Sequence, residues 1–241
     1  ELSKIYGFSI IEDASHAIGG EYINKKVGSC KFSHISVFSF HPVKIITTGE
    51  GGMAVCNDQY IHKKMIKLRS HGITKNKKDF QIPNNDPWNY EMQELGYNYR
   101  ITDISCALGI SQLNRIDNII KERNMIYKTY ETLLEELPVS LVEIPNNVKS
   151  SVHLGIIRLN QNNKNFHRKI FNYFRKNNIG VQLHYSPVHL QPYYRNKGFN
   201  VGDFPISENY SKDAISLPLF PGIQPEEINR VITCLKSALI S

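Results

Sequence analysis

Long apolar runs and paired cysteines are both missing from this sequence of 241 residues. No segment approaches the roughly 20 apolar residues that a membrane-spanning helix needs, so we expect no such helix in this sequence. No basic segment followed by an apolar one precedes the first helix, so no secretory leader is indicated. The four cysteines, Cys30, Cys56, Cys106 and Cys234, lack CxxC or metal-ligand spacing. We therefore expect reduced thiols, no metal site and a cytoplasmic protein without a membrane segment.

Concentrated positive charge is missing too, although the formal net charge is +7. Nucleic-acid-binding proteins neutralise phosphates with clustered lysines and arginines. The densest cluster here, Lys75 to Lys78, lies in a polar segment beside Pro83, and no groove-reading motif accompanies it. A solvated loop is the favoured interpretation, a small anionic partner is the next, and no nucleic-acid partner is expected.

In the first half of the chain, strand-like and helix-like segments alternate, which is typical of an α/β fold with a mostly parallel sheet. Short apolar runs predict strands over residues 8–12, 35–38 and 53–56. Residues 21–27 predict a small hairpin with its turn at 24–26. Asn57 and Asp58 can cap a helix that runs to about Ser70.

The second half predicts a small α+β domain that follows a long helix. Thr102 is suited to cap a helical pattern that continues with little interruption to Leu137 and stops at Pro138. Residues 151–159 and 180–183 predict strands, residues 166–177 predict a helix, and Pro225 opens a last amphipathic helix. We place the domain boundary near residue 118, which gives a domain of residues 1–118 and a second of residues 119–241.

The first seven residues are typical of the last turns of a helix that closes on Gly7. We therefore expect the chain to begin partway through a larger protein, with residues 1–118 forming the carboxy-terminal part of a large domain. Such a piece would expose sheet edges that the rest should cover, so we expect it to be inactive alone.

A lysine, a carboxylate and a hydroxyl follow the ends of predicted strands. Asp13 comes after the first strand, and Ser39 and Lys44 follow the second, before the glycine-rich turn Gly49–Gly52. Ligands bind at the carboxyl edge of parallel sheets. Pyridoxal phosphate (PLP) needs a lysine for a Schiff base, a carboxylate for its ring nitrogen and hydroxyl or amide groups for its phosphate. Taken singly, these residues could be a turn cap, a satisfied loop hydroxyl and a solvated lysine.

Three stretches resemble the signatures of the DegT/DnrJ/EryC1/StrS group of sugar aminotransferases. They are Glu12–Ala17, Ser39–Gly52 and Gly96–Arg100. The resemblance implies a fold-type I PLP-dependent transferase that works as a homodimer with shared active sites on nucleotide-linked keto sugars. It implies Lys44 as the lysine that carries the cofactor, Asp13 as the partner of its ring nitrogen and Ser39 as a phosphate ligand. By the same resemblance His16 lies at the ring 3-hydroxyl, and Asn98 reaches the phosphate of the neighbouring subunit's cofactor.

Two stretches taken together, Asp13–Gly19 and His184–Tyr194, resemble more narrowly the members of the family that act in pseudaminic acid biosynthesis. This implies amino transfer from glutamate to C4 of a UDP-linked 4-keto-6-deoxy-N-acetyl sugar. His184, Tyr185 and His189 offer donors and stacking surfaces suited to a sugar and a uracil. A proline-punctuated structural loop is the alternative interpretation of the same residues.

Rival functions remain open. The chain could serve a different nucleotide-linked keto sugar, or it could be a catalytically idle PLP-fold binding protein. Sugar 3-dehydratases resemble these aminotransferases but carry histidine in place of the lysine, so Lys44 itself argues against them.

Overall fold

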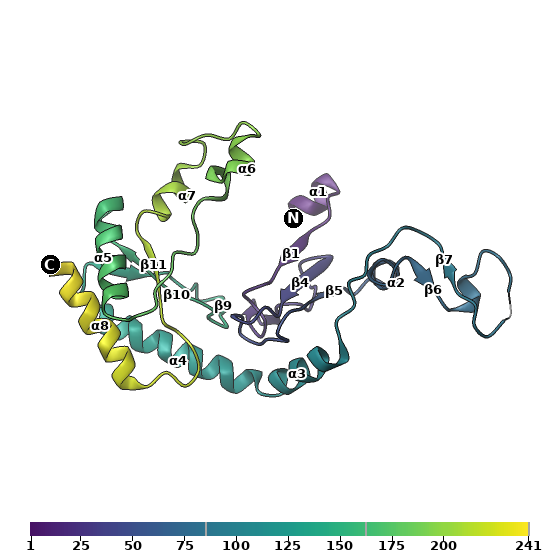
Figure 1. Ribbon diagram of the computed structural model, residues 1–241, viewed down its shortest axis with the longest axis horizontal. Coiled ribbons are helices and arrows are strands. Elements are labelled where there is room, and N and C mark those ends of the chain that lie inside the picture. The colour runs from purple at the N-terminus through teal and green to yellow at the C-terminus, as the bar shows by residue number, and fades with distance from the viewer. Residues whose placement is uncertain (85, 162, 241) are drawn as a thin grey trace. The chain divides into compact units, whose positions relative to one another are not determined.

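The computed structural model describes residues 1–84, 86–161 and 163–240 (Figure 1). Its backbone forms two compact units. The first consists of Glu1–Asp117 together with Asn147–Lys149, and the second contains Asn118–Asn146 and the residues from Ser150 onward. Each unit has its own sheet.

The first unit combines short strands with helices at both ends of its sequence. Its helices are α1 (Leu2–Tyr6), α2 (Gln59–Arg69), the 3-10 turn η1 (Lys77–Asp79) and α3 (Asp103–Leu113). Its strands are β1 (Ile11–Asp13), β2 (Glu21–Tyr22), β3 (Lys25–Lys26), β4 (Ile35–Ser39), β5 (Gly52–Val55), β6 (Ile73–Thr74), β7 (Glu91–Met92) and β9 (Val148–Lys149).

The sheet that matters for the site has the order β1-β4-β5. Strands β1 and β4 are parallel, with Asp13 opposite Val37, whereas β4 and β5 are antiparallel. The sheet that the sequence predicts to be mostly parallel is therefore mixed within the described residues. The connection over residues 40–51 contains no helix and folds back on itself through hydrogen bonds between Phe40 and Gly51 and between Thr48 and Phe40, so β5 returns antiparallel to β4.

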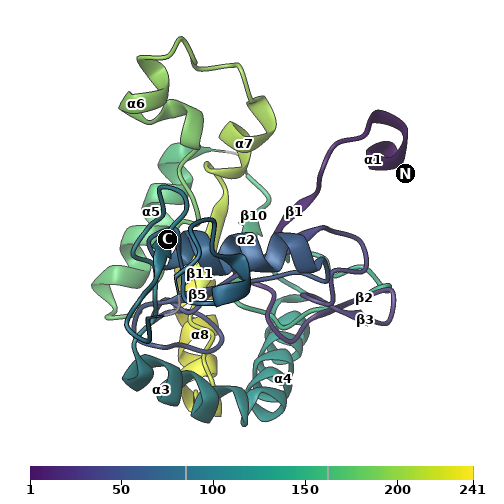
Figure 2. The same cartoon turned by 90° about the vertical axis from the view of Figure 1, so that its right-hand side faces the viewer.

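The hairpin of β2 and β3 forms with its turn one residue earlier than predicted (Figure 2). Ile23 and Asn24 occupy the turn with φ of 48° and 57°. Two central residues with positive φ are the geometry that matches the twist of a two-residue hairpin. Strand β9 extends this ladder by pairing with β2.

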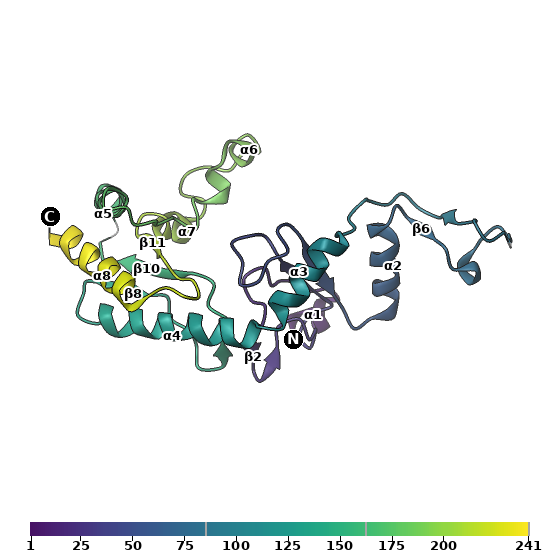
Figure 3. The ribbon, with the colours of Figure 1, turned by 60° about the horizontal axis from the view of Figure 1, so that its bottom comes forward.

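Helix caps form where the sequence predicts them. The Asp58 carboxylate accepts a hydrogen bond from Ile61 N at the start of α2, and Thr102 Oγ1 accepts one from Ser105 N at the start of α3. Beyond α2, β6 pairs with β7 in an arm of the first unit (Figure 3).

The predicted long helix is interrupted. Helix α3 ends at Leu113, and α4 runs over Ile116–Leu134, so it also stops before Leu137. At the break Arg115 N donates to Gln112 O, a tightened turn of 3-10 type. Apolar residues keep helical spacing across a break of two residues, which is why the periodicity does not reveal it.

The second unit encloses an apolar core between a sheet and helices (Figures 1 and 3). Its antiparallel sheet has the order β11-β10-β8. The elements besides α4 are β8 (Val139–Leu141), β10 (Gly155–Leu159), α5 (Lys164–Lys176), the 3-10 turn η2 (Val188–Leu190), α6 (Pro192–Arg195), α7 (Pro205–Tyr210), β11 (Ala214–Leu217) and α8 (Pro225–Ile240). The strand predicted over 180–183 is reduced to a single bridge between Gln182 and Ser216.

Polar groups inside this core bond to backbone carbonyls. The Tyr130 hydroxyl donates to Pro218 O at 2.8 Å. The buried Arg123 guanidinium donates to His153 O at 3.1 Å and to Leu219 O at 3.3 Å. These bonds tie α4 to two segments that flank the sheet. No described helix is both long and apolar enough to cross a membrane.

We expect Ile157→Ala to destabilise the second unit by about 2–5 kcal/mol, because Ile157 is fully buried in β10 and its loss leaves a cavity. Urea titration measures the free energy of unfolding, and hydrogen exchange of the β10 and β11 amides reports the unfolding of this unit. Ile206→Ala is the matched control, since Ile206 is 86% exposed and its truncation should change stability by no more than about 0.5 kcal/mol. Similar losses in both variants would contradict the assigned core.

Candidate active site

Strand pairing places two of the predicted site positions, Asp13 and Ser39, on one face of a sheet. Residues opposite each other in a parallel pair share a face, and alternate residues of one strand share it too. Asp13 lies opposite Val37, and Ser39 is two residues beyond Val37 in β4. This face is open, whereas Ser36 and Phe38 on the other face are buried. Asp13 and Ser39 therefore lie at the same end of the sheet, on its accessible side.

Lys44 lies on a loop that buried side chains and hydrogen bonds hold in place. Ile45 and Ile46 are only 4% and 3% exposed, and they anchor the loop directly after the lysine. Lys44 N donates to His41 O at 2.9 Å, which closes a turn. Lys44 itself is half-buried. Its ammonium group thus extends from a fixed backbone.

The glycine turn after Lys44 closes the loop. Phe40 N donates to Gly51 O at 2.9 Å, and Thr48 N donates to Phe40 O at 3.0 Å. Gly51 has a φ of 154°, and a Cβ atom there would lie 2.4 Å from Thr48 Oγ1. A larger residue at this position would displace the threonine that the loop closure uses.

Electrostatic coupling joins Asp13 to Lys44. Hydrogen bonds from the Ser15 hydroxyl and Ser15 N lower the pKa of Asp13, and the nearby charges of His16 and Lys44 lower it further. Partial burial lowers the pKa of Lys44, and the Asp13 charge opposes that shift. The structure therefore brings His16 and Lys44 within electrostatic reach of Asp13.

Asp13 is held by one oxygen only. Its Oδ1 accepts from Ser15 N at 3.0 Å and from Ser15 Oγ at 2.5 Å, an Asx turn of the kind that the sequence leaves open as an alternative. Among the described residues no hydrogen bond engages Oδ2. The turn thus fixes the carboxylate and leaves one oxygen available.

Asn98 belongs to a different segment of the first unit. It forms a bridge with Ser70 at the end of α2, and its Oδ1 accepts from Arg100 Nη2 at 3.3 Å. The same arginine lies 3.4 Å from His71 Nε2. Sequence reasoning assigned no role to Arg100, although it ends the Gly96–Arg100 motif. Asn98 is exposed beside this cation.

The predicted substrate residues of the second unit differ in accessibility. His184 Nδ1 lies 2.8 Å from Ser216 Oγ of β11, and the His184 and Tyr185 rings contact edge to face. Tyr185 is 60% exposed. Ser216 therefore fixes His184, and the adjacent phenol faces solvent.

His189 is engaged within the second unit, and its predicted substrate contact stays a prediction. It is 8% exposed, and its Nε2 lies 2.9 Å from Glu208 Oε1. Gly202 N donates to the same carboxylate oxygen at 2.7 Å. The pair fastens η2 to α7. Glu208 had no signal in the sequence, because it lies 19 residues after His189.

No group of three or more His, Cys, Asp or Glu side chains within residues 1–84, 86–161 and 163–240 could hold a metal ion.

The family model of the DegT/DnrJ/EryC1/StrS aminotransferases matches residues 1–236. The chain belongs to this family. The UDP-4-amino-4,6-dideoxy-N-acetyl-beta-L-altrosamine transaminase of Campylobacter jejuni strain 81-176 is 39% identical over 220 residues, which are 90% of this chain and 55% of that protein. The resemblance inferred from the three sequence stretches is confirmed.

Solved structures agree with the family match. Helicobacter pylori PseC, an aminotransferase involved in pseudaminic acid biosynthesis, is 33% identical with a TM-score of 0.88, over 98% of this chain and 61% of that one. The PLP form of Spr1654 from Streptococcus pneumoniae is 28% identical with a TM-score of 0.87, over 99% and 59%. The predicted fold-type I architecture is confirmed. The chain spans about three-fifths of the length of these proteins.

We expect Asp13→Asn to lower the pKa of Lys44 further, because the Asp13 charge is what opposes the effect of burial on that amine. Competitive acylation across a pH series, read by mass spectrometry of the Lys44 peptide, measures the shift. Glu50→Gln removes an equal charge from the exposed tip of the same loop and should leave the Lys44 pKa unchanged. Equal shifts in the two variants would contradict a specific coupling.

We expect the His189–Glu208 pair to stabilise the second unit at neutral pH and to be lost in acid. The hydrogen bond from His189 and that from Gly202 N lower the pKa of Glu208 below its ordinary value. The stabilisation is therefore complete above that ordinary value and disappears as the pH falls through the lower, folded one. Thermal unfolding from pH 7 to pH 3 should show wild type and Glu208→Gln converging at low pH. Glu135→Gln, at an exposed position after α4, is the control, and a constant gap at every pH would contradict the assignment.

Proposed function

We propose that this chain contributes the lysine-bearing part of a PLP-dependent nucleotide-sugar aminotransferase. The reaction would move an amino group from glutamate to C4 of a UDP-linked 4-keto-6-deoxy-N-acetyl sugar in pseudaminic acid biosynthesis. The observation that carries the proposal is the coupling of a half-buried Lys44 to an ionised Asp13 on one accessible sheet edge. The relatives named above support the class of substrate.

The donor set fits pyridoxal phosphate. Lys44 would hold the cofactor aldehyde, Asp13 the ring nitrogen and Ser39 the phosphate, and His16 would lie near the ring 3-hydroxyl. The open Oδ2 of Asp13 is the atom that could accept a hydrogen bond from a protonated ring nitrogen. When bound, PLP supplies an electron sink for the pair released as the α C–H bond of the amino donor breaks. Asn98 would serve the neighbouring subunit of a homodimer.

Lys44 would move the proton. Burial lowers its pKa, so a larger fraction of its Nζ is neutral near pH 7 than for a solvated lysine. A neutral Nζ would take the proton from the α-carbon of the amino donor and hold it for return. The backbone turn at His41 and the buried Ile45 keep this atom in one region during both transfers. The role of the loop is thus positioning.

Asp13 would provide the negative charge that stabilises a protonated ring nitrogen of the cofactor. Its lowered pKa keeps the carboxylate charged throughout the neutral range, as an ion pair with a protonated ring nitrogen requires. Ser15 fixes the carboxylate through Oδ1 without neutralising it. A charged partner at this position favours the form of the ring that withdraws electrons best.

His184 and Tyr185 are the groups of the second unit that we propose for the nucleotide-linked sugar. Tyr185 offers an exposed ring and hydroxyl, and Ser216 holds the neighbouring imidazole. A different nucleotide-linked keto sugar is the alternative within this reaction class. An idle PLP-fold binding protein is the alternative outside it.

In the complete protein that contains this chain, we expect Lys44→Ala to abolish transamination and borohydride-fixed attachment of PLP, because no other amine of the loop would replace it. Three measurements test this on the same samples. Absorbance after PLP addition and mass spectrometry of the reduced Lys44 peptide report cofactor attachment, and glutamate-dependent turnover reports transamination. Lys25→Ala in the exposed hairpin is the control and should behave as wild type. Full turnover by Lys44→Ala would contradict the proposal. Attachment without turnover on any keto sugar would favour the idle binding protein, and a panel of UDP-linked and other keto sugars separates the remaining substrates.

A further inference from the structure

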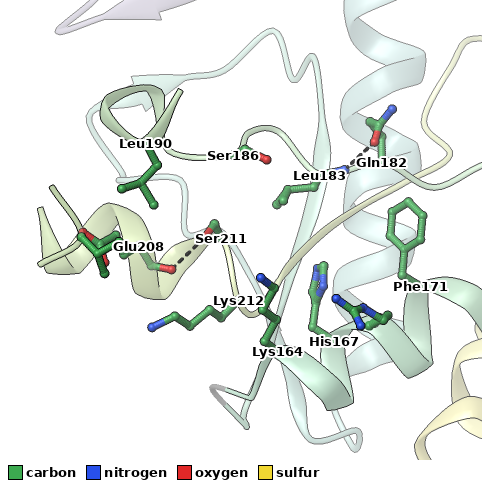
Figure 4. Close-up of a pocket in the computed structure, with 12 residues that line it drawn as sticks. Lys164, His167, Phe171, Gln182, Leu183, Ser186, Leu190, Glu208, Ser211 and Lys212 are labelled. Atoms are coloured by element: carbon green, nitrogen blue, oxygen red, sulfur yellow. Dashed lines mark hydrogen bonds between the residues drawn. The ribbon is translucent and has the colours of Figure 1, made fainter. Parts of the chain in front are cut away.

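The second unit contains a cavity of about 570 Å³ between the start of α5, the segment 182–190 and the end of α7 (Figure 4). Its volume lies in the range of sites for small molecules. Three cations line it: Lys164 and Arg168 of α5, and Lys212 just after α7. None of these residues belongs to the Lys44 site or to the proposed sugar site.

The positive charges of this cavity are not neutralised by the described part of the chain. Lys164 and Arg168 lie one turn apart on α5, a spacing at which like charges destabilise a helix. Neither forms an ion pair with a described residue, and Lys212 Nζ donates only to Asn209 Oδ1, at 3.2 Å. The acid on the wall, Glu208, is already engaged by His189 and Gly202 N.

The next acid along the chain is engaged as well. Asp213, which follows Lys212, accepts two hydrogen bonds from Arg158, at 2.9 and 2.6 Å. Both carboxylates near the cavity are therefore committed elsewhere, and the cavity keeps an excess of positive charge.

Helix electrostatics make the arrangement more unusual. Lys164 is the first residue of α5, and the first turn of this helix contains no acidic residue. The amino end of a helix carries partial positive charge and normally favours anions and acidic side chains. Cations at this end raise the energy of the free protein, and a bound anion would relieve it.

His167 provides an independent polar group in the same wall. Its side chain is 9% exposed, and its Nε2 lies 2.9 Å from Ala214 O. Its other ring nitrogen, Nδ1, has no hydrogen bond with any described residue. In Figure 4 the His167 and Lys164 side chains rise from α5 toward the segment that carries Leu183. A nine-tenths buried imidazole thus faces the cavity with one nitrogen unpartnered.

We propose that this cavity binds a small organic phosphate. Three cations require more than one negative charge, and a phosphate monoester carries about −1.5 to −2 at pH 7. Lys164, Arg168 and Lys212 would bind the phosphate oxygens through charge-assisted hydrogen bonds. Phe171, Leu183 and Leu190 form an apolar wall that suits the organic group of such an ester.

The test uses phenyl phosphate as the probe and the full chain in phosphate-free buffer, with isothermal titration calorimetry as the readout. We expect the double variant Lys164→Gln/Arg168→Gln to bind at least about tenfold more weakly than wild type, because two charge-assisted contacts are lost. Lys169→Gln/Arg175→Gln removes the same charges from α5 outside the cavity and should bind as wild type does. Equal weakening in both double variants would reduce the effect to general electrostatics and overturn the proposal.

Thermal unfolding adds a readout of the charge repulsion that needs no ligand. Without phosphate, Lys164→Gln/Arg168→Gln should be at least as stable as wild type, because the like-charge repulsion is gone. Phenyl phosphate should raise the midpoint of wild type and of the control but not of this variant. Lys212→Gln, which leaves α5 intact, should also lose the rise. If inorganic phosphate binds as tightly as phenyl phosphate, the proposal that the ligand carries an organic group is overturned. If neither compound binds, the proposed site itself is overturned.

Discussion

The hydrogen bonds of Phe40 are the constraint on which the rest of the first unit's site depends. Its N–H donates to Gly51 O, and its carbonyl accepts from Thr48 N and from the Thr47 hydroxyl. These bonds turn residues 40–51 into a closed loop in which Ile45 and Ile46 are buried. A lysine on an open loop would be solvated and would keep its ordinary pKa. Closure is therefore what gives Lys44 both a fixed position and partial desolvation.

Because side chains alternate along β1, the neighbouring acids Glu12 and Asp13 lie on opposite faces of the sheet and make different contacts. Glu12 points to the inner face of the sheet, where Ser36 and Ser33 donate to its Oε2. Asp13 points to the open face and keeps one oxygen accessible. A shift of β1 by one residue would exchange the two carboxylates, so the parallel register with β4 determines which acid meets Lys44.

Structure that depends on neighbouring residues, such as helix caps, was predictable from the sequence. Contacts between residues far apart in the chain were not. The caps at Asp58 and Thr102 formed as predicted, because a cap depends on neighbours only three residues away. The break after Leu113 left no trace, since apolar spacing continues across it. The burial of His189 depends on Glu208, and nothing in either residue's neighbourhood indicates the pairing. For the site, motif order predicted Asp13 and Lys44 as partners, whereas their mutual pKa effects needed the fold.

The hydrogen bond between His189 and Glu208 affects two neighbouring parts of the second unit. By engaging His189, Glu208 holds the segment that follows His184 and Tyr185, and so limits the positions that these rings can take. The same carboxylate also accepts from Gly202 N, and it cannot neutralise the cations of the adjacent cavity at the same time. The excess charge around Lys164 and Lys212 is therefore a consequence of how this loop is fastened. A protein that needed only a stable loop could have neutralised those lysines with one more acid on α5, and this sequence does not.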